Sequence, residues 1–354
     1  MVENVIIMAG GAGKRLWPAS LGSRPKQFMS IDGDSSLIRG AMDRAFALGL
    51  EGSVYIVTHE DHVEAAVAEC GKLESHLRAK VVILAEPIAR NTAPALALAA
   101  ARMNMDRRER QTSLVMAADH LISPIEAFSA SAEAAANVAG SGFIVPFGIT
   151  PTTPATGYGY IEVGEPVGEG YEVKSFREKP DAETAAKYLS SGNYLWNAGL
   201  FTYRNDIFLS ELAAWAPDVS KAFSRPKEDW FETRVENGIV IHSPSSELRR
   251  IYQGCPAISV DYAVMEKTGK IRMVKAEFEW NDVGSWDVIA DLDPPSKTPL
   301  YSVESRGNFV YSDKPVALCG VEDLIVVVSH DRVMICRKGK SQLVKEAAEE
   351  DLSR

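Results

Sequence analysis

The sequence predicts an α/β protein with a mixed, mostly parallel central sheet and a small, separate β module towards its C-terminal end. Three observations lead to this fold class. Residues 1–150 alternate between short Val- and Ile-rich runs and longer helical stretches, residues 150–290 lose this alternation, and short strand-like runs return after residue 300. Short apolar strands separated by helices indicate βαβ units and a parallel sheet. A chain of 354 residues suits one large and one small domain.

The alternating part defines the expected sheet and the helices that cover it. The expected strands are Val5–Ala9, Val54–Val57, Val81–Leu84, Leu114–Ala117 and Phe143–Val145. The expected helices are Leu37–Leu48, Asp61–Leu77, Ala93–Arg108 and Ile125–Ala139. In such sheets ligands bind beyond the carboxyl ends of the strands.

Residues 150–290 are expected to form an insertion that completes a pocket over the sheet. They mix aromatic-rich strands with helices: Tyr158–Val163, Tyr194–Tyr203, Asp181–Leu189, Asn205–Trp215 and Tyr262–Lys267. A Pro-rich link at 293–297 then leads into residues 300–354, which we expect to form the β module. Its predicted strands are Asn308–Tyr311, Val316–Cys319, Leu324–Ser329 and Arg332–Arg337, before an acidic helix from Ser341.

Composition excludes several classes of function. The net charge of −10 opposes a nucleic-acid-binding surface. The four cysteines form no C-x-x-C pair, so we expect buried, reduced thiols rather than a zinc site or a disulfide framework. No signal peptide or membrane-length apolar run is found, and we therefore expect a cytoplasmic protein with no membrane partner.

A Gly-rich segment follows the first predicted strand directly and is the first candidate site. Its glycines, Gly10, Gly11 and Gly13, allow a tight turn with N–H groups close to an anion. Leu16 occupies the third glycine position of a dinucleotide fingerprint, and Met8 occupies the first glycine position of a P-loop. Lys14 and Arg15 instead place two cations at the turn, which suits a polyphosphate. The alternative is an ordinary βα turn.

Two aspartates are candidate Mg²⁺ ligands. Asp119 follows the fourth predicted strand, and Asp282 lies in a Trp-Asn-Asp-Val-Gly segment far along the chain, so only folding can bring the pair together. Mg²⁺ takes hard oxygen ligands, commonly one or two carboxylates plus substrate phosphates. Alternatively, Asp119 caps the following turn. His120 is expected to be a structural neighbour of Asp119 rather than a metal ligand.

Three short segments between residues 157 and 199 suit a sugar phosphate. Glu178 offers a carboxylate and Asn197 an amide, while Gly159 can expose a backbone N–H; these groups suit vicinal hydroxyls. Lys179 suits the phosphate. The alternative for the Gly-Tyr-Gly-Tyr segment at 157–160 is a packed strand.

Together these segments closely resemble the sugar nucleotidyltransferase family, and in particular its guanylyl/mannose branch. The resemblance covers residues 1–290 almost continuously and extends to the tail. The segments that carry it are 10–18, 25–28, 86–94, 118–120, 157–161, 176–180, 196–199, 259–266 and 280–284. Ala12 and Lys14 depart from the pattern, because relatives often have Ser and Glu there.

The resemblance implies a fold, a reaction and a cofactor. It implies a Rossmann-like nucleotidyltransferase domain over residues 1–292 and a left-handed β-helix-like domain over residues 300–354. It further implies transfer of GMP from GTP to mannose 1-phosphate with Mg²⁺, giving GDP-mannose and pyrophosphate. The isomerase domain that some relatives carry is expected to be absent.

The resemblance also implies a role for each site residue. The implied catalytic residues are Arg15, Lys26, Asp119 and Asp282, with both aspartates on the metal. The implied nucleotide-binding residues are Ala9, Gly10, Gly11, Gly13, Lys14, Arg15, Lys26, Glu86, Pro87, Asn91, Thr92, Ala93 and Asp119. The implied sugar-phosphate-binding residues are Gly159, Glu178, Lys179, Asn197 and Asp282.

Three alternatives stay open at this point. One is a sister transferase that uses another nucleoside triphosphate or another sugar 1-phosphate. A second is a regulatory homologue without catalysis, although such a protein should have lost Arg15, Lys26 or one of the two aspartates. Third, the small β domain is a candidate oligomerisation module, which would make a homodimer.

Overall fold

A computed structural model of the chain describes residues 1–11, 13–20, 24–31, 35–106, 110–294 and 298–352. The chain divides into two compact units. The first unit comprises Met1–Gly10, Ala41–Ala117 and Ile122–Trp280. The second comprises Gly11–Gly40, Ala118–Leu121 and Asn281–Arg354. The described residues include no helix that is long and apolar enough to span a bilayer.

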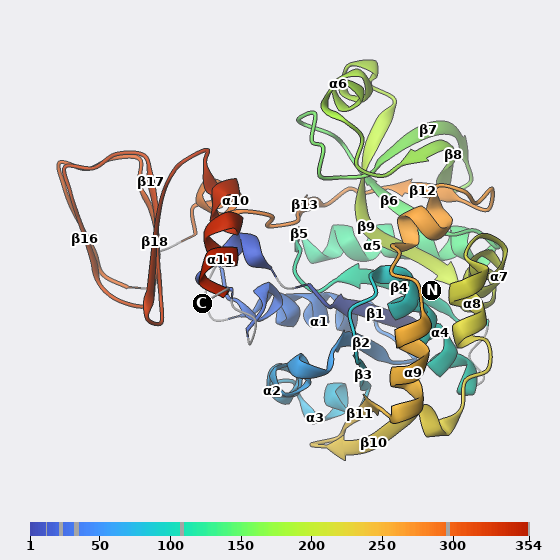
Figure 1. Ribbon diagram of the computed structural model, residues 1–354. Helices are drawn as coiled ribbons and strands as arrows, with labels where there is room; N and C mark the ends of the chain where they lie inside the picture. The colour runs from blue at the N-terminus through green and yellow to red at the C-terminus, as the bar shows by residue number, and fades with distance from the viewer. Residues whose placement is uncertain (12, 21–23, 32–34, 107–109, 295–297, 353–354) are drawn as a thin grey trace. The chain divides into compact units, whose positions relative to one another are not determined.

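The first unit is built on one large sheet, drawn in Figure 1. Its strands are β1 (Asn4–Ala9), β2 (Val54–His59), β3 (Val81–Glu86), β4 (Thr112–Ala117), β6 (Val145–Ile149), β7 (Tyr160–Val167), β8 (Gly170–Arg177), β9 (Tyr194–Arg204), β10 (Phe231–Glu236), β11 (Ile239–Pro244) and β12 (Arg272–Lys275). Among the described residues this sheet has 11 strands in the order β10-β11-β3-β2-β1-β4-β9-β6-β12-β8-β7. Two further short strands, β5 (Leu121–Ser123) and β13 (Glu279–Asn281), lie outside it.

The sheet is mixed, so the prediction of a mostly parallel sheet holds only for one section. From β11 through β3, β2 and β1 to β4 every neighbouring pair is parallel. Beyond β4, however, β9 runs antiparallel to both β4 and β6, and β7 and β8 form an antiparallel hairpin. Antiparallel neighbours need only a short turn, whereas parallel neighbours need a crossover. The aromatic runs after residue 150 gave no signal of strand direction.

Two helices pack against the large sheet. The Ala-rich α4 (Thr92–Met105) contacts β1, β2 and β3, and ten of its residues are buried. Small side chains allow this close helix–sheet approach. α5 (Ile125–Gly140) contacts β4, β6, β9 and β12. The other helices and turns assigned wholly or mainly to this unit are α1 (Leu37–Ala47), η3 (Glu60–His62), α2 (Val63–Gly71), α3 (Ser75–Arg78), α6 (Ala182–Ser191), α7 (Asn205–Trp215), α8 (Pro217–Phe223), η4 (Glu228–Trp230), α9 (Ser246–Gly254) and η5 (Asp261–Met265).

The second unit joins the C-terminal strands to much earlier segments. It contains η1 (Lys14–Leu16), η2 (Lys26–Phe28), α10 (Trp286–Leu292), β14 (Leu300–Val303), β15 (Phe309–Ser312), β16 (Val316–Cys319), β17 (Leu324–Ser329), β18 (Arg332–Arg337), η6 (Ser341–Leu343) and α11 (Val344–Leu352). β14 pairs with β16 and β15 with β17, both in parallel, whereas β17 and β18 are antiparallel. Parallel pairing between successive turns is what a β-helix requires. Its left-handed coil stays a prediction.

One hydrophobic cluster runs through the second unit. It includes Leu16 beside the Gly-rich segment, Val283 and Trp286 around α10, and Ile325 and Val327 from β17. The fully buried Trp286 also donates a hydrogen bond from its indole Nε1 to the backbone oxygen of Trp17 at 2.9 Å. The segment after Gly10 therefore packs with the C-terminal strands. The domain boundary between residues 292 and 300 stays a prediction.

Candidate active site

The Gly-rich turn of the second unit has one position that only glycine can occupy. Gly13 has a φ of +60°, and a Cβ built there would lie 2.6 Å from Lys26 Cβ and 2.7 Å from Ser20 Oγ. Its backbone oxygen accepts from the N–H of Leu16 at 2.9 Å, which closes the first turn of η1. Leu16 is buried while Arg15 is exposed. The packing of Leu16 therefore holds the turn in place, and the Arg15 side chain is accessible to solvent. Ala12 and the side chain of Lys14 lie outside the described residues.

A cavity of about 330 Å³ lies next to this turn within the second unit. Arg15, Lys26, Asp119 and Asp282, all four predicted catalytic residues, line it together. Its other described lining residues are Gly13, Leu16, His120, Val283, Gly284 and Lys345. The two aspartates, far apart in the sequence, therefore do face one space.

Lys26 links the two acidic positions. Its Nζ donates to Asp119 Oδ2 at 2.8 Å and to the backbone oxygen of Asp282 at 2.5 Å. Burial by itself would raise the pKa of Asp119, but the positive charges of Lys26 and then His120 outweigh it and lower that pKa. His120 Nε2 lies 4.0 Å from Asp119 Oδ1. Asp119 is therefore an ionised carboxylate at neutral pH.

A strained turn holds Asp282. Val283 has a φ of 49°, which is unfavourable for a β-branched residue, and it is fully buried. Its N–H donates to Asn281 Oδ1 at 2.7 Å. At Gly284, a Cβ would meet Asp282 Oδ2 at 2.9 Å. This backbone conformation brings the Asp282 carboxylate back over the turn.

The donors around this cavity fit a magnesium ion. Asp119 and Asp282 supply carboxylate oxygens, and Mg²⁺ commonly binds through one or two carboxylates while substrate phosphates and water complete its shell. Within the described ranges, no group of three or more His, Cys, Asp or Glu side chains is gathered for a metal ion. Substrate phosphates and water would complete the coordination shell of a metal ion held by the two aspartates.

The predicted nucleotide-binding residues of the first unit cluster at the ends of β1 and β3. Glu86 ends β3, is only 6% exposed, and accepts from the Tyr252 hydroxyl at 3.2 Å. Burial raises the pKa of Glu86 to about 8 despite that hydrogen bond. A Cβ on Gly10, just beyond β1, would lie 3.9 Å from Glu86 Oε2. Ala9 and Pro87 are buried beside these two positions in the sequence.

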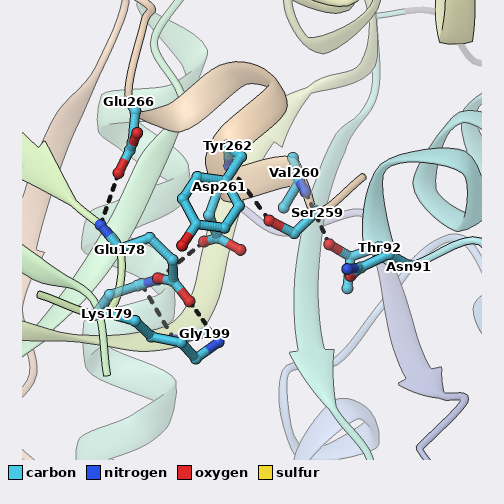
Figure 2. A network of polar contacts seen from close by, with 11 residues as sticks. Asn91, Thr92, Glu178, Lys179, Gly199, Ser259, Val260, Asp261, Tyr262 and Glu266 are labelled. Carbon is cyan, nitrogen blue, oxygen red and sulfur yellow. Dashed lines mark hydrogen bonds and ion pairs between the residues drawn. The ribbon is translucent and has the colours of Figure 1, made fainter. Parts of the chain in front are cut away.

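The start of α4 holds the other predicted nucleotide-binding residues. Asn91 has a φ of 67° and caps the helix, because its Oδ1 accepts from the N–H of Thr92 at 2.8 Å. Thr92 Oγ1 accepts from the N–H of Val260 at 2.8 Å, and the N–H of Ala93 donates to Ile258 at 3.1 Å. Figure 2 shows this link between Thr92 and the 259–262 segment. The helix start is thus tied to the chain around residue 260.

The predicted sugar-phosphate residues of the first unit lie together. Glu178 is buried, and its Oε1 accepts from Lys179 Nζ at 2.7 Å. A Cβ on Gly159 would lie 2.6 Å from Glu178 Oε2 and 3.2 Å from Asn197 Cβ. The N–H of Asn197 donates to the Gly159 oxygen at 2.8 Å. Asp282, the fifth residue of this predicted set, belongs instead to the second unit.

Sequence reasoning missed Asp261 as a candidate site residue. Its Oδ1 accepts from Asn197 Nδ2 at 3.2 Å, and Figure 2 shows its side chain close to Glu178 and Lys179. Burial, and then the negative charge of Glu178, raises the pKa of Asp261 to about 6. The Ser-Val-Asp-Tyr-Ala run carried the family resemblance, but nothing local in it placed Asp261 beside Glu178. The roles of all these residues stay predictions.

Comparison with known proteins identifies the family. Residues 4–295 match the nucleotidyl transferase family, and residues 300–350 match the MannoseP isomerase/GMP-like beta-helix domain. The chain is 37% identical to mannose-1-phosphate guanylyltransferases of Escherichia coli and Klebsiella pneumoniae, each over 97% of this chain and 73% of the relative. It also superposes on a crystal structure of a mannose-1-phosphate geranyltransferase from Thermus thermophilus. That alignment has a TM-score of 0.85 and 28% identity, and it covers 100% of both chains. The chain therefore belongs to the nucleotidyl transferase family, and within it to the mannose-1-phosphate guanylyltransferases.

Proposed function

We propose that this chain transfers GMP from GTP to α-D-mannose 1-phosphate, giving GDP-mannose and pyrophosphate. The relatives named above support the activity, since they match along 97% of the chain. The observation that carries the proposal is the cavity that gathers Arg15, Lys26, Asp119 and Asp282. Two cations and two carboxylates in one space suit a polyphosphate bound with Mg²⁺.

The chemistry is an in-line displacement at the α-phosphorus. An oxygen of the sugar phosphate forms a bond to the α-phosphorus of GTP. At the same time, the bond breaks between this phosphorus and the oxygen that bridges it to the β-phosphorus, so that pyrophosphate leaves. The attacking oxygen is already anionic, so no general base is needed. The barrier lies in the repulsion between two anions and in the charge that builds up on the leaving pyrophosphate.

Arg15 and Lys26 are assigned to neutralising the negative charge of the reacting phosphates. Arg15 is exposed beside the Gly-rich turn and is assigned to the triphosphate together with the backbone of Gly11 and Gly13. Lys26 is assigned to the α-phosphate, since its ammonium is held between Asp119 and the backbone of Asp282. Mg²⁺ bound through the two aspartates would neutralise phosphate charge and help to orient the phosphates.

Base, ribose and sugar are assigned to residues of the first unit. Glu86, Pro87, Asn91 and Thr92 are assigned to guanine and ribose. At pH 7 the carboxyl of Glu86 is mostly protonated, so it offers a hydrogen-bond donor as well as an acceptor. Mannose is assigned to polar groups at Gly159, Glu178 and Asn197, and its phosphate to Lys179. Asp261 joins this set because its carboxylate accepts from the amide of Asn197.

A panel of substrates tests the proposal directly. The purified chain is assayed for pyrophosphate release with GTP, ATP, UTP, CTP and dTTP, each paired with mannose, glucose or galactose 1-phosphate. We expect the largest kcat/KM with GTP and mannose 1-phosphate, and loss of turnover when EDTA removes the divalent metal. A larger kcat/KM with another pair would show a sister transferase. Binding of a nucleotide sugar without any turnover would show a regulatory protein.

Two further expectations accompany this proposal. A homodimer formed through the C-terminal β domain would double the mass seen by light scattering, which a monomer would not. Fractionation of cells that produce the chain would test its expected cytoplasmic location.

A further inference from the structure

The C-terminal helix α11 is fastened to the rest of the second unit at its start. Asp287 of α10 accepts three hydrogen bonds there, from Gly339 N at 2.6 Å, Ser341 N at 3.0 Å and Ser341 Oγ at 2.5 Å. Ser341 is fully buried, and Val344 and Ala348 of α11 are buried as well. Burial by itself would raise the pKa of Asp287, but these hydrogen bonds outweigh it and lower that pKa. The first turn of α11 therefore has a fixed position.

Hydrogen bonds also hold the C-terminal end of α11, next to the Gly-rich turn. Asp351 Oδ2 accepts from Trp17 Nε1 at 3.4 Å and from Arg332 Nε at 3.0 Å. Trp17 follows directly on η1, and α11 and η1 lie in contact. The helix thus lies along the turn that presents Arg15.

This position brings one more cation to the cavity of the second unit. Lys345, the second residue of α11, lines the same cavity as Arg15, Lys26, Asp119 and Asp282. Its side chain is 55% exposed and pairs with Glu349 Oε1 at 4.0 Å, one turn along the helix. An exposed pair at that distance contributes little, so it does not hold the ammonium away from a stronger anion.

The charges of the cavity lining explain what a third cation adds. Apart from Lys345 and from His120, whose charge depends on its protonation, the described lining residues carry two positive charges, from Arg15 and Lys26, and two negative charges, from Asp119 and Asp282. These four charges cancel. Lys345 therefore adds a positive charge to this balanced set, which favours an anionic ligand.

We propose that Lys345 binds the pyrophosphate portion of the nucleotide and the pyrophosphate that is released. This inference rests on the proposed function for the identity of the nucleotide. Lys26 is held by Asp119 and is assigned to the α-phosphate, whereas Arg15 and Lys345 are exposed cations on either side of the contact between η1 and α11. A lysine ammonium on a flexible stem is well suited to a phosphate group.

The test measures binding of Mg²⁺–pyrophosphate by calorimetry without any sugar phosphate, so that it needs no turnover. We expect Lys345→Met to weaken this binding about tenfold, the loss typical of a charge-assisted hydrogen bond. We expect Lys345→Arg to recover most of the affinity. The matched control is Glu349→Gln, which removes the helical partner but keeps the lysine, and should bind as tightly as the wild type.

Steady-state kinetics supply a second readout. Lys345→Met should raise the KM for GTP about tenfold while the KM for mannose 1-phosphate stays within about twofold. A thermal melt of each variant checks folding, and Lys345→Gln replaces the methionine variant if that one melts early. Unchanged pyrophosphate affinity in a folded Lys345 variant would overturn the inference.

The two proposals fail in different ways. If the wild type transfers GMP to mannose 1-phosphate but Lys345→Met binds pyrophosphate normally, only the role of Lys345 falls. If pyrophosphate binding depends on Lys345 but no guanylyl transfer occurs with any sugar phosphate, the anion site stands and the proposed function falls.

Discussion

The ammonium of Lys26 lies 2.8 Å from the carboxylate of Asp119, and both side chains line the cavity of the second unit. The lysine side chain is 9% exposed and that of Asp119 is 30% exposed, so the pair is only partly shielded from water. The proximity lowers the pKa of Asp119 and keeps this carboxylate ionised. A change at Lys26 should therefore alter the titration of Asp119.

Lys26→Met should therefore affect both rate and pH dependence. Loss of a cation at the reacting phosphate should lower kcat/KM about 10²–10³-fold. Because Lys26 lowers the pKa of Asp119, its removal should raise that pKa and move the acid limb of the kcat/KM profile to higher pH. Lys72→Met is the control, since Lys72 forms a comparable 2.8 Å pair with Glu69 on the exposed surface. An unmoved acid limb would contradict the coupling.

Arg15→Ala tests the assignment of Arg15 to the triphosphate. We expect turnover with GTP and mannose 1-phosphate to fall about 10²–10³-fold, because an exposed arginine beside the Gly-rich turn would neutralise the leaving pyrophosphate. The thermal melting point should barely change, since the side chain is exposed. Arg225→Ala, at another exposed arginine, should keep full activity. Near-normal turnover of the Arg15 variant would remove Arg15 from the mechanism.

Glu86 gives a prediction about stability and pH. Its pKa of about 8 lies above the value of 4.5 in the unfolded chain, so the folded state holds a proton that the unfolded state releases. Stability should therefore fall as pH rises from about 4.5 to about 8, by about 2–4 kcal/mol. Glu86→Gln should flatten this part of the curve, as measured by urea unfolding between pH 5 and 9. Equal slopes for the two proteins would refute the raised pKa.

Gly159→Ala tests the predicted sugar pocket. The added Cβ would lie 2.6 Å from Glu178 Oε2, so the carboxylate must move. Such overpacking costs about 1–3 kcal/mol, and we expect at least a tenfold rise in the KM for mannose 1-phosphate with little change for GTP. Gly157→Ala is a close control, because a Cβ there meets no atom within 4 Å. If both variants behave alike, Gly159 has no special role.

The sequence predicted local features well and long-range features less well. The positive φ of Gly13 belongs to a local turn, and the βαβ pattern of residues 1–117 follows from apolar runs alternating with helices. Both signals lie within a few residues of the features that they predict. The direction of β9 was not predicted, because Tyr194–Arg204 reads as a strand in either orientation.

Two residues near the candidate sites illustrate the same limit. Lys345 lies on an acidic helix, where a lysine suggests only an exposed face, and its place at the cavity depends on Asp287 and Trp17. Asp261 lies in a turn whose position beside Asn197 depends on the pairing of distant strands. Composition and spacing carry no information about contacts between residues that are far apart in the sequence. Only the packing of the chain brings these residues together.

The shared hydrophobic cluster of Leu16, Trp286 and Ile325 has a consequence for cooperativity. Residues from the two ends of the chain that bury one another must lose their order together, so the Gly-rich turn and the β17 strand behave as one folding unit. A phosphate ligand on the turn would then slow amide hydrogen exchange in β17, although that strand contributes no residue to the cavity.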